Sequence, residues 1–449
     1  MQVGLLIGSI GDGTRDSIVA MIPTPSFEEG SSAIEITGTA ADSGRKGKAP
    51  KPSPEAQVRI QADWVIEHAS QVAPLLPGGV RVAGLYIWAP EASHAAAMQQ
   101  LCRILLGLRT SKLLTGDAVL LCAAAPSAKL SARELPASAS SAAALRSCDC
   151  RSAPVLASHA SVSTMYSLRA ACTIMRTAEQ LPDGLRRTVQ AEEDSLAAAT
   201  ICLGAAELPE AGTPVAELCQ PGSDVLNARM LTPPACCSDM CAGQQTGVAH
   251  GRTCLTGAIA GRALVHKRDS WGTAVSALKE DLQRSLQARL NVMLTEAQEA
   301  EATTGEDDSQ APLLQQADTV YGAPQCCSMP QRALLPAQGP LMYSDYCSGE
   351  QHATLEALVL DTASTVLGLP DLTKEQVVWP ESAAAQPRPI VWDPMAVDAE
   401  ITGEGVESAS TALRKSNDQL CMLLGAGAVG MLALAVGAAW LYSGSQYPT

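Results

Sequence analysis

A single uncharged segment near the end of the chain restricts the possible folds more than any other feature. Residues 420–442, LCMLLGAGAVGMLALAVGAAWLY, run for 23 positions without Asp, Glu, Lys or Arg. Such a run is long enough to cross a bilayer with some tilt, and a crossing segment must satisfy all its backbone polar groups internally. The sequence therefore predicts a transmembrane helix here. The alternative is a buried C-terminal core helix.

The surroundings of this segment predict its orientation. Seven residues follow it, so we expect insertion after synthesis, as in a tail anchor. Arg414 and Lys415 precede it, which favours a cytosolic body, and the tail after it lacks basic residues, which favours the endoplasmic reticulum membrane. The anchor, with aromatic rings at its interface end, is assigned to residues that include Leu420, Leu424, Gly430, Leu434, Trp440 and Tyr442.

The composition fits a cytosolic body with a large core. The chain has 449 residues, of which 47% are hydrophobic, and this length predicts roughly two or three domains. The formal charge of -15 argues against nucleic acid as a partner. The 15 cysteines are scattered and no secretory signal opens the chain, which predicts reduced thiols.

The first 123 residues predict an α/β (α+β) unit with a mixed sheet. Val58, Ala62, Val65, Ala69 and Val72 have the spacing of one helical face. Strands are expected at residues 3–10, 18–22, 80–88 and 117–123, and helices at 58–72 and 92–109. This order predicts a sandwich of sheet and helices, and we assign residues 1–123 to it.

The remainder divides by composition. Residues 124–253 are expected to be a low-complexity, loop-rich insertion with weak strands, one of them an edge strand at 161–173. Residues 254–370 predict a second strand-and-helix part that packs on the core. Residues 371–419 are acidic and Pro-rich and predict a flexible tether to the 420–442 anchor.

The second part contains the strongest amphipathic pattern, at residues 273–294. Lys279, Glu280, Arg284 and Arg289 are expected to face away from the core, and the acidic residues 296–310 are expected to form a solvated linker. The apolar stripe of this predicted helix comprises Val275, Leu278, Leu282, Leu286, Leu290 and Met293.

Three segments carry a resemblance to a known family. They are GLLIGS at 4–9, DWVIEHASQVAPLLPGGVRVAGLYI at 63–87 and GAIAGRALVHKR at 257–268. With the C-terminal span, they resemble the Odr-four-like family, the homologues of the odorant-response protein odr-4. The most specific motif positions are Asp63, Trp64, Glu67, His68, Pro77, Gly78 and Gly79.

The resemblance implies a fold and a function. Family members have an MPN-like cytosolic body on the endoplasmic reticulum membrane, recruit the Ufm-one-specific cysteine protease, and support folding and export of G-protein-coupled receptors, including odorant receptors sent to cilia. This sequence departs from them in two places. Members begin with a helix upstream of the GLLIG strand, which predicts a truncation before Met1, and residues 124–160 are replaced by Ala/Ser-rich sequence.

An MPN domain that cleaves isopeptide bonds needs two imidazoles, a carboxylate and a water that zinc acidifies. In such enzymes the strand that corresponds to residues 80–88 ends in His-x-His. The matching positions here are Ile87, Trp88 and Ala89, and His94 follows alone. The sequence therefore predicts a protein that is not an enzyme and holds no cofactor.

A weak candidate for a metal site lies in PACCSDMCAGQQTGVAHGRTC. Cys237 and Cys241 are separated by three residues, and His250 and Cys254 repeat this gap, a spacing that structural zinc tolerates. Solvated loop cysteines are the alternative, and the one favoured here.

The leading hypothesis is a non-catalytic, membrane-anchored adaptor with a protein partner and no nucleic acid. Two alternatives stay open. One is a zinc-dependent isopeptidase of the MPN type with displaced ligands. The other is a receptor-export chaperone that contacts its clients directly through the membrane span.

Overall fold

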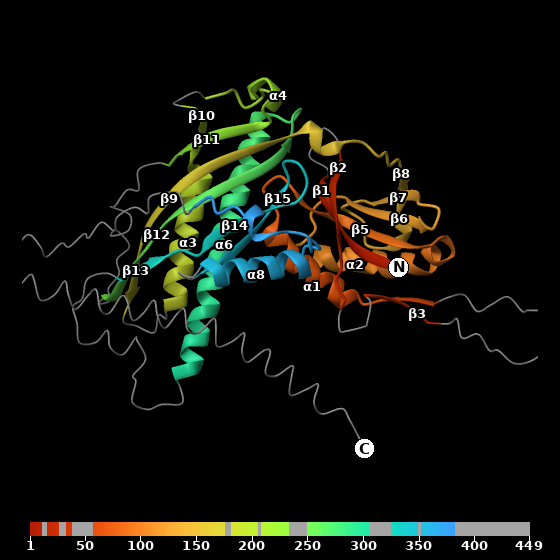
Figure 1. The fold of residues 1–449 in the computed structure, drawn as a ribbon, viewed down its shortest axis with the longest axis horizontal. Coiled ribbons are helices and arrows are strands. Elements are labelled where there is room, and N and C mark those ends of the chain that lie inside the picture. Colours follow the sequence, from red (N-terminus) through yellow and green to blue (C-terminus); the bar gives the residue numbers. More distant parts are fainter. Residues whose placement is uncertain are drawn as a thin grey trace, which may run out of the picture.

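The computed structural model describes residues 1–10, 16–26, 33–37, 57–175, 181–204, 208–232, 249–304, 325–348 and 352–381. These residues form an α+β fold in which two mixed sheets stand side by side, with two short hairpins beside them (Figure 1). The α+β fold with mixed sheets predicted from the sequence is confirmed. Residues 420–442 lie outside the described part, and no helix within that part is both long and apolar enough to cross a membrane.

The first sheet has the strand order β2-β1-β5-β6-β7-β8. Its neighbours pair antiparallel except β5 and β6, which are parallel and are connected by helix α2 (Glu91–Thr110). A parallel pair needs such a crossover. Its strands are β1 (Gln2–Ser9), β2 (Ser17–Pro23), β5 (Arg81–Pro90), β6 (Ala118–Ala125), β7 (Lys129–Leu135) and β8 (Arg146–Cys148).

Helices α1 (Ala62–Val72) and α2 cover one face of the first sheet. Leu101, Leu105 and Leu108 of α2 are fully buried against the strands, as their helical spacing predicts. The expected start of α1 at Val58 is wrong. Val58 pairs with Ile36 in a hairpin of β3 (Ile34–Thr37) and β4 (Gln57–Ile60), a partner that local periodicity does not reveal.

Residues 124–160 belong to the segment that was expected to be low in complexity and rich in loops, with only weak strands. Instead β7 and β8 extend the first sheet, and 3-10 turns at Ala142–Ala144 and Val155–Ser158 follow them. Ala132 and Leu135 of β7 are buried. Small side chains are sufficient here because the pairing rests on backbone hydrogen bonds to β6, which composition does not report.

The second sheet has the order β10-β11-β9-β12-β13. β9 was expected to be an edge strand, yet it lies between β11 and β12 and pairs with β12 along its length. The division expected at 253 falls inside β12. The strands are β9 (His159–Met175), β10 (Thr200–Leu203), β11 (Val225–Leu231), β12 (Ala249–His266) and β13 (Gln325–Ser328).

Helices α3 (Leu181–Ala198) and α6 (Trp271–Thr304) pack on one face of the second sheet, and the short α4 (Val215–Leu218) lies near its end (Figure 1). Leu278, Leu282, Leu286 and Leu290 of α6 are buried, which confirms the apolar stripe. The linker expected from 296 is wrong, because α6 continues to Thr304. Its Glu/Ala-rich end has high helix propensity.

The last described segment returns to the first core. A hairpin of β14 (Gln331–Pro336) and β15 (Met342–Cys347) and helix α8 (His352–Thr365) contribute Leu335 and Val359 to it. A 3-10 turn (Lys374–Gln376) follows, and Val378 exchanges backbone hydrogen bonds with Leu334. The tether therefore does not begin at 371, since the chain stays on the body through Glu381.

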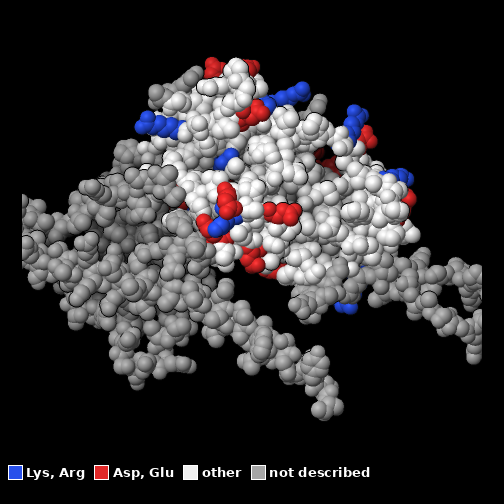
Figure 2. Space-filling view, viewed as in Figure 1, with Lys and Arg blue, Asp and Glu red and all other residues white. Residues whose placement is uncertain are grey.

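Charged side chains are sparse on the face drawn in Figure 2, where they stand in small groups on a largely uncharged surface. The described part of this face shows no continuous basic stripe of the kind that follows a phosphate backbone.

Because Leu286 is fully buried between α6 and the second sheet, Leu286→Ala is expected to lower the free energy of unfolding by about 2–5 kcal/mol. Urea unfolding followed by tryptophan fluorescence measures this. Ser276→Ala, on the exposed side of α6, is the matched control and should stay within about 0.5 kcal/mol. Equal effects of the two changes would contradict the assigned face of α6.

Candidate functional site

If the body, MPN-like as the family resemblance implies, were a zinc-dependent MPN domain, its metal would be expected at the end of β5. Ile87 is fully buried in the core under α1 and α2, and Ala89 is buried beside it. Trp88 points to the opposite face and is 53% exposed. Neither Ile87 nor Trp88 offers a lone pair to zinc. His94 donates its Nε2–H to the Ala89 carbonyl at 3.1 Å, so the nitrogen nearest the strand end is engaged.

Trp88 belongs to a row of side chains across the first sheet. It pairs with Ala123 on β6, which in turn pairs with Leu130 on β7. Directly paired residues lie on the same face, so Trp88 and the 49% exposed Leu130 lie on the face away from α1 and α2. On the same face, next to this row, a small cluster of side chains is buried, namely those of Leu6, Tyr86, Leu121 and Ala132.

The structure places the weak zinc candidates only in part. Cys237 and Cys241 lie outside the described residues. His250 and Cys254 belong to strand β12, where Cys254 pairs with Cys326 of β13. Across the described ranges, no three His, Cys, Asp or Glu side chains gather closely enough to hold a metal ion.

The motif residues on α1 connect this helix to its neighbours. Trp64 donates its indole N–H to the Pro25 carbonyl at 2.9 Å, while Asp63 and Glu67 are exposed. His68 is fully buried and donates its Nε2–H to the carbonyl of Val366, beyond the end of α8, at 2.8 Å. Burial lowers the pKa of His68, and the hydrogen bond to Val366 only partly offsets it. A neutral imidazole therefore fixes α1 to α8.

The Pro77-Gly78-Gly79 turn joins the first layer to the second sheet. The Gly78 N–H donates to the Arg262 carbonyl at 3.0 Å, and the Gly78 carbonyl accepts the Leu264 N–H at 2.9 Å. A Cβ on Gly78 would lie 2.0 Å from the Ala277 carbonyl oxygen of α6, so no other residue fits. Gly79 has a φ of +78°, the left-handed region that favours glycine. The second and third family segments thus contact each other here.

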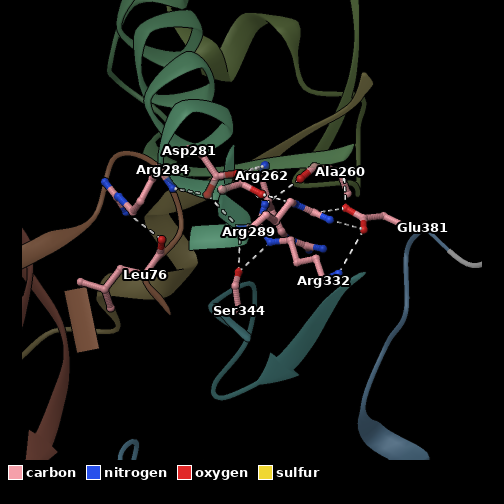
Figure 3. Close-up of polar contacts among 11 residues, drawn as sticks. Leu76, Ala260, Arg262, Asp281, Arg284, Arg289, Arg332, Ser344 and Glu381 are labelled. Atoms are coloured by element: carbon pink, nitrogen blue, oxygen red, sulfur yellow. Dashed lines mark hydrogen bonds and ion pairs between the residues drawn. The ribbon is translucent and has the colours of Figure 1, made fainter. Parts of the chain in front are cut away.

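Asp281 of α6 completes this junction from beneath. Its Oδ1 accepts the Gly78 N–H at 3.2 Å and its Oδ2 accepts the Arg262 N–H at 2.7 Å (Figure 3). Arg332 of β14 approaches it with two parallel bonds of 2.7 and 2.9 Å. Both side chains are 1% exposed. Burial by itself lowers the pKa of Arg332 and is the largest single cause, but the charge and hydrogen bonds of Asp281 together with the charges of Tyr346 and Glu381 make the net shift upward.

A second buried pair lies beside the first. Arg289 of α6 donates to both carboxylate oxygens of Glu381, at 3.0 and 2.5 Å, and to the Pro330 carbonyl. Glu381 also accepts the backbone N–H groups of Ala260 and Arg332. The expectation that Arg289 faces away from the core is wrong, because its side chain is 1% exposed. Helical spacing places Arg289 on the polar side of α6, but the carboxylate of Glu381, about ninety residues away in the sequence, compensates its charge in the interior.

The comparisons with known proteins address the same segments. The model of the family ODR4-like, odorant response abnormal 4-like, matches residues 4–369, which contain the turn and the Asp281–Arg332 pair. The chain belongs to the ODR4-like family. None of the curated proteins is similar enough to be counted as a relative.

Among solved structures, the ODR4-like chain is similar to a crystal structure of UfSP from C. elegans. The match has 10% sequence identity and a TM-score of 0.39, and it covers 86% of this chain and 56% of UfSP. The chain thus spans little more than half the length of that protein.

Sequence reasoning found the turn but missed the charges beneath it. Pro77, Gly78 and Gly79 were identified through the family motif, whereas Asp281, Arg332 and Glu381 were not. Asp281 carried a usable signal, because it follows Leu278 of the apolar stripe by three residues and so lies on the same side of the helix. Glu381 carried none, since it lies in a segment whose composition predicts solvent.

The Gly78 contact predicts a specific weakness. Gly78→Ala is expected to destabilise the protein by about 1–3 kcal/mol, because the new methyl group collides with the Ala277 carbonyl. Hydrogen exchange of the Leu264 amide, which bonds Gly78, should accelerate. Gly212→Ala is the matched control, since its Cβ would meet no atom within 4 Å. Unchanged protection at Leu264 would disprove the role of the turn.

The Arg289–Glu381 pair predicts a non-additive cycle. Glu381→Ala leaves Arg289 buried without its carboxylate and is expected to cost about 3–5 kcal/mol, while the double variant Arg289→Met/Glu381→Leu should recover most of the loss. Asp183→Ala breaks the exposed pair with Arg186 and should cost less than about 1 kcal/mol. Denaturant midpoints of these variants and of the single variants Arg289→Met and Glu381→Leu complete the cycle, and additive losses in it would be inconsistent with a direct pair.

Proposed function

We propose that this ODR4-like protein is a non-catalytic adaptor that brings a partner protein to the endoplasmic reticulum membrane. The observation that carries the proposal is the end of β5. Where a metal-dependent MPN domain would present imidazoles, this chain has a buried Ile87 and an indole at Trp88 that is 53% exposed. A large aromatic side chain on a sheet surface is suited to binding protein, whereas it offers nothing to zinc.

The partner proposed is the Ufm-one-specific cysteine protease. Membership of the ODR4-like family supports this choice, since the sequence resemblance to that family carries the same expectation. The surface proposed is the row formed by Trp88 and Leu130, and the exposed Met21 lies farther along the same face. Tryptophan is enriched among the few residues that dominate binding energy at interfaces, and the polar surroundings of such residues exclude water.

The membrane part of the proposal rests on residues 420–442. Their 23 uncharged positions support a tail anchor, with the described body in the cytosol. Anchoring raises the local concentration of a bound partner without any new contact. The protein would then act on conjugates at the membrane, and on folding and export of G-protein-coupled receptors, by placing the protease rather than by catalysis.

Trp88→Glu tests the proposed surface in the full chain. It is expected to reduce co-purification of the Ufm-one-specific protease by at least about tenfold, because interface tryptophans commonly contribute about 2 kcal/mol or more. Leu208→Glu, at a side chain that is 62% exposed and lies outside this row, is the control and should leave co-purification unchanged. A melting temperature equal to that of the wild type would show that both variants fold.

Three outcomes would count against the adaptor. Undiminished protease binding by Trp88→Glu would remove the proposed surface. One equivalent of zinc together with isopeptidase turnover would favour the MPN-type enzyme with displaced ligands. Loss of receptor export when 420–442 is replaced by an unrelated tail anchor would favour a chaperone that contacts clients through the span.

A further inference from the structure

A buried histidine lies at a second place where the two sheets meet. His159 is the first residue of β9 and is 2% exposed. Its ring reaches Ser17, the first residue of β2, which is a terminal strand of the first sheet. Because Ser17 and Trp88 pair with opposite ends of β1, at Ser9 and Gln2, this place is distant from the proposed adaptor surface and independent of it.

The hydrogen bonds of His159 define where its proton lies. Its Nδ1–H donates to the Val155 carbonyl at 2.8 Å, since a carbonyl oxygen can only accept. The Nε2 of the neutral ring is then an acceptor, and the hydroxyl of Ser17 donates to it over a long distance of 3.5 Å. A second proton would turn Nε2 into a donor and reverse the direction of the bond with Ser17. We call these two hydrogen bonds the His159 contact.

The end of β12 places charged and titratable groups beside this ring. His266 pairs with His159 across the two strands, and its ring lies edge to face at 5.3 Å between centroids. Lys267 adds a cation, although Asp224 pairs with it at 2.7 Å. The carboxylate of Asp269 favours protonation of His159, while its Oδ2 accepts the His266 N–H at 3.0 Å. An added proton on His159 would therefore meet a second imidazole and a lysine as well as one carboxylate.

The elements on the other side of the ring supply little to stabilise a charge. The turn at 155–158 has no titratable side chain, and Asp16, which directly precedes Ser17, is exposed. Burial lowers the pKa of His159, and the hydrogen bond to Val155 only partly offsets it. The neutral ring is thus the form that the folded structure holds.

We propose that the His159 contact is a pH-sensitive connection between β2 and the second sheet, which is closed while the ring is neutral and opens when the ring is protonated. Protonation puts a charge in a place closed to water and reverses the bond with Ser17. Opening frees the outer edge of β2, and an unpaired strand edge can pair with another chain.

The direction of the pH dependence follows from the environment of His159. Its pKa in the closed state lies below the value of about 6.5 for an exposed histidine. The contact therefore contributes its full stability above about pH 6.5, and this contribution is lost as the pH falls below that value toward the pKa of the closed state.

Hydrogen exchange of the full chain between pH 7.5 and pH 5.0, followed by mass spectrometry, measures the opening. The amide of Lys267 is the reporter, because it donates to the carbonyl of Ser158, next to His159, at 2.8 Å. After correction for the intrinsic exchange rate, its protection is expected to fall by at least about threefold at pH 5.0. Strand β6, at residues 118–125, is the reference within the same molecule and should change less.

Two variants connect this loss to the ring. His159→Gln should keep the protection of Lys267 nearly constant across the same pH range, because an amide offers a donor and an acceptor but does not titrate. His68→Gln is the matched control, since His68 is also fully buried with a lowered pKa but joins α1 to α8. It should leave the pH dependence at Lys267 intact. A pKa below 6.5 for His159, measured by NMR of labelled histidine rings, is expected in the wild type.

Four results would overturn the proposal. These are protection at Lys267 that does not change with pH, an equal pH dependence in His159→Gln, a pKa of 6.5 or higher for His159, and an equal loss of protection in β6. The last result would mean that acid unfolds the whole body rather than opening the His159 contact.

Discussion

The carboxylate of Asp281 is the group on which the joining of the two sheets depends. It binds the Gly78 turn of the first layer, the backbone of β12 and the guanidinium of Arg332 at once, in a place that is closed to water. A buried carboxylate is tolerated only when its charge and all its acceptor positions are satisfied. The three segments must therefore reach their final positions together, which makes the junction a condition of the fold rather than an addition to it.

This dependence explains why the motif segments are packed into the junction between the two sheets. Gly78 has no space for a side chain, His68 is held neutral against Val366, and Arg289 needs Glu381 from the last described turn. These are positions of support. The exposed Trp88 lies elsewhere, on the face of the first sheet away from α1 and α2.

Local patterns predicted the elements whose stability is local. The strands around Leu5 and Leu85, helix α2 and the stripe of α6 follow from periodicity, because each buries one continuous face. The errors share one cause. Val58, the β7 and β8 strands and the central position of β9 are each determined by a pairing partner that is distant or compositionally weak. Register and neighbour are properties of the assembled sheet.

The sequence by itself determined the membership of the ODR4-like family, the mixed α+β class, the apolar core faces and an Ile-Trp-Ala end to β5 that has no zinc ligand. Only the tertiary structure decided that Arg289 is buried, that residues up to Glu381 belong to the body, and that Asp281 and Arg332 pair beneath the Gly78 turn. The reason is physical. Hydrophobic periodicity is a property of a single helix or strand, whereas buried charges are balanced by residues that are distant in sequence and come together only on folding.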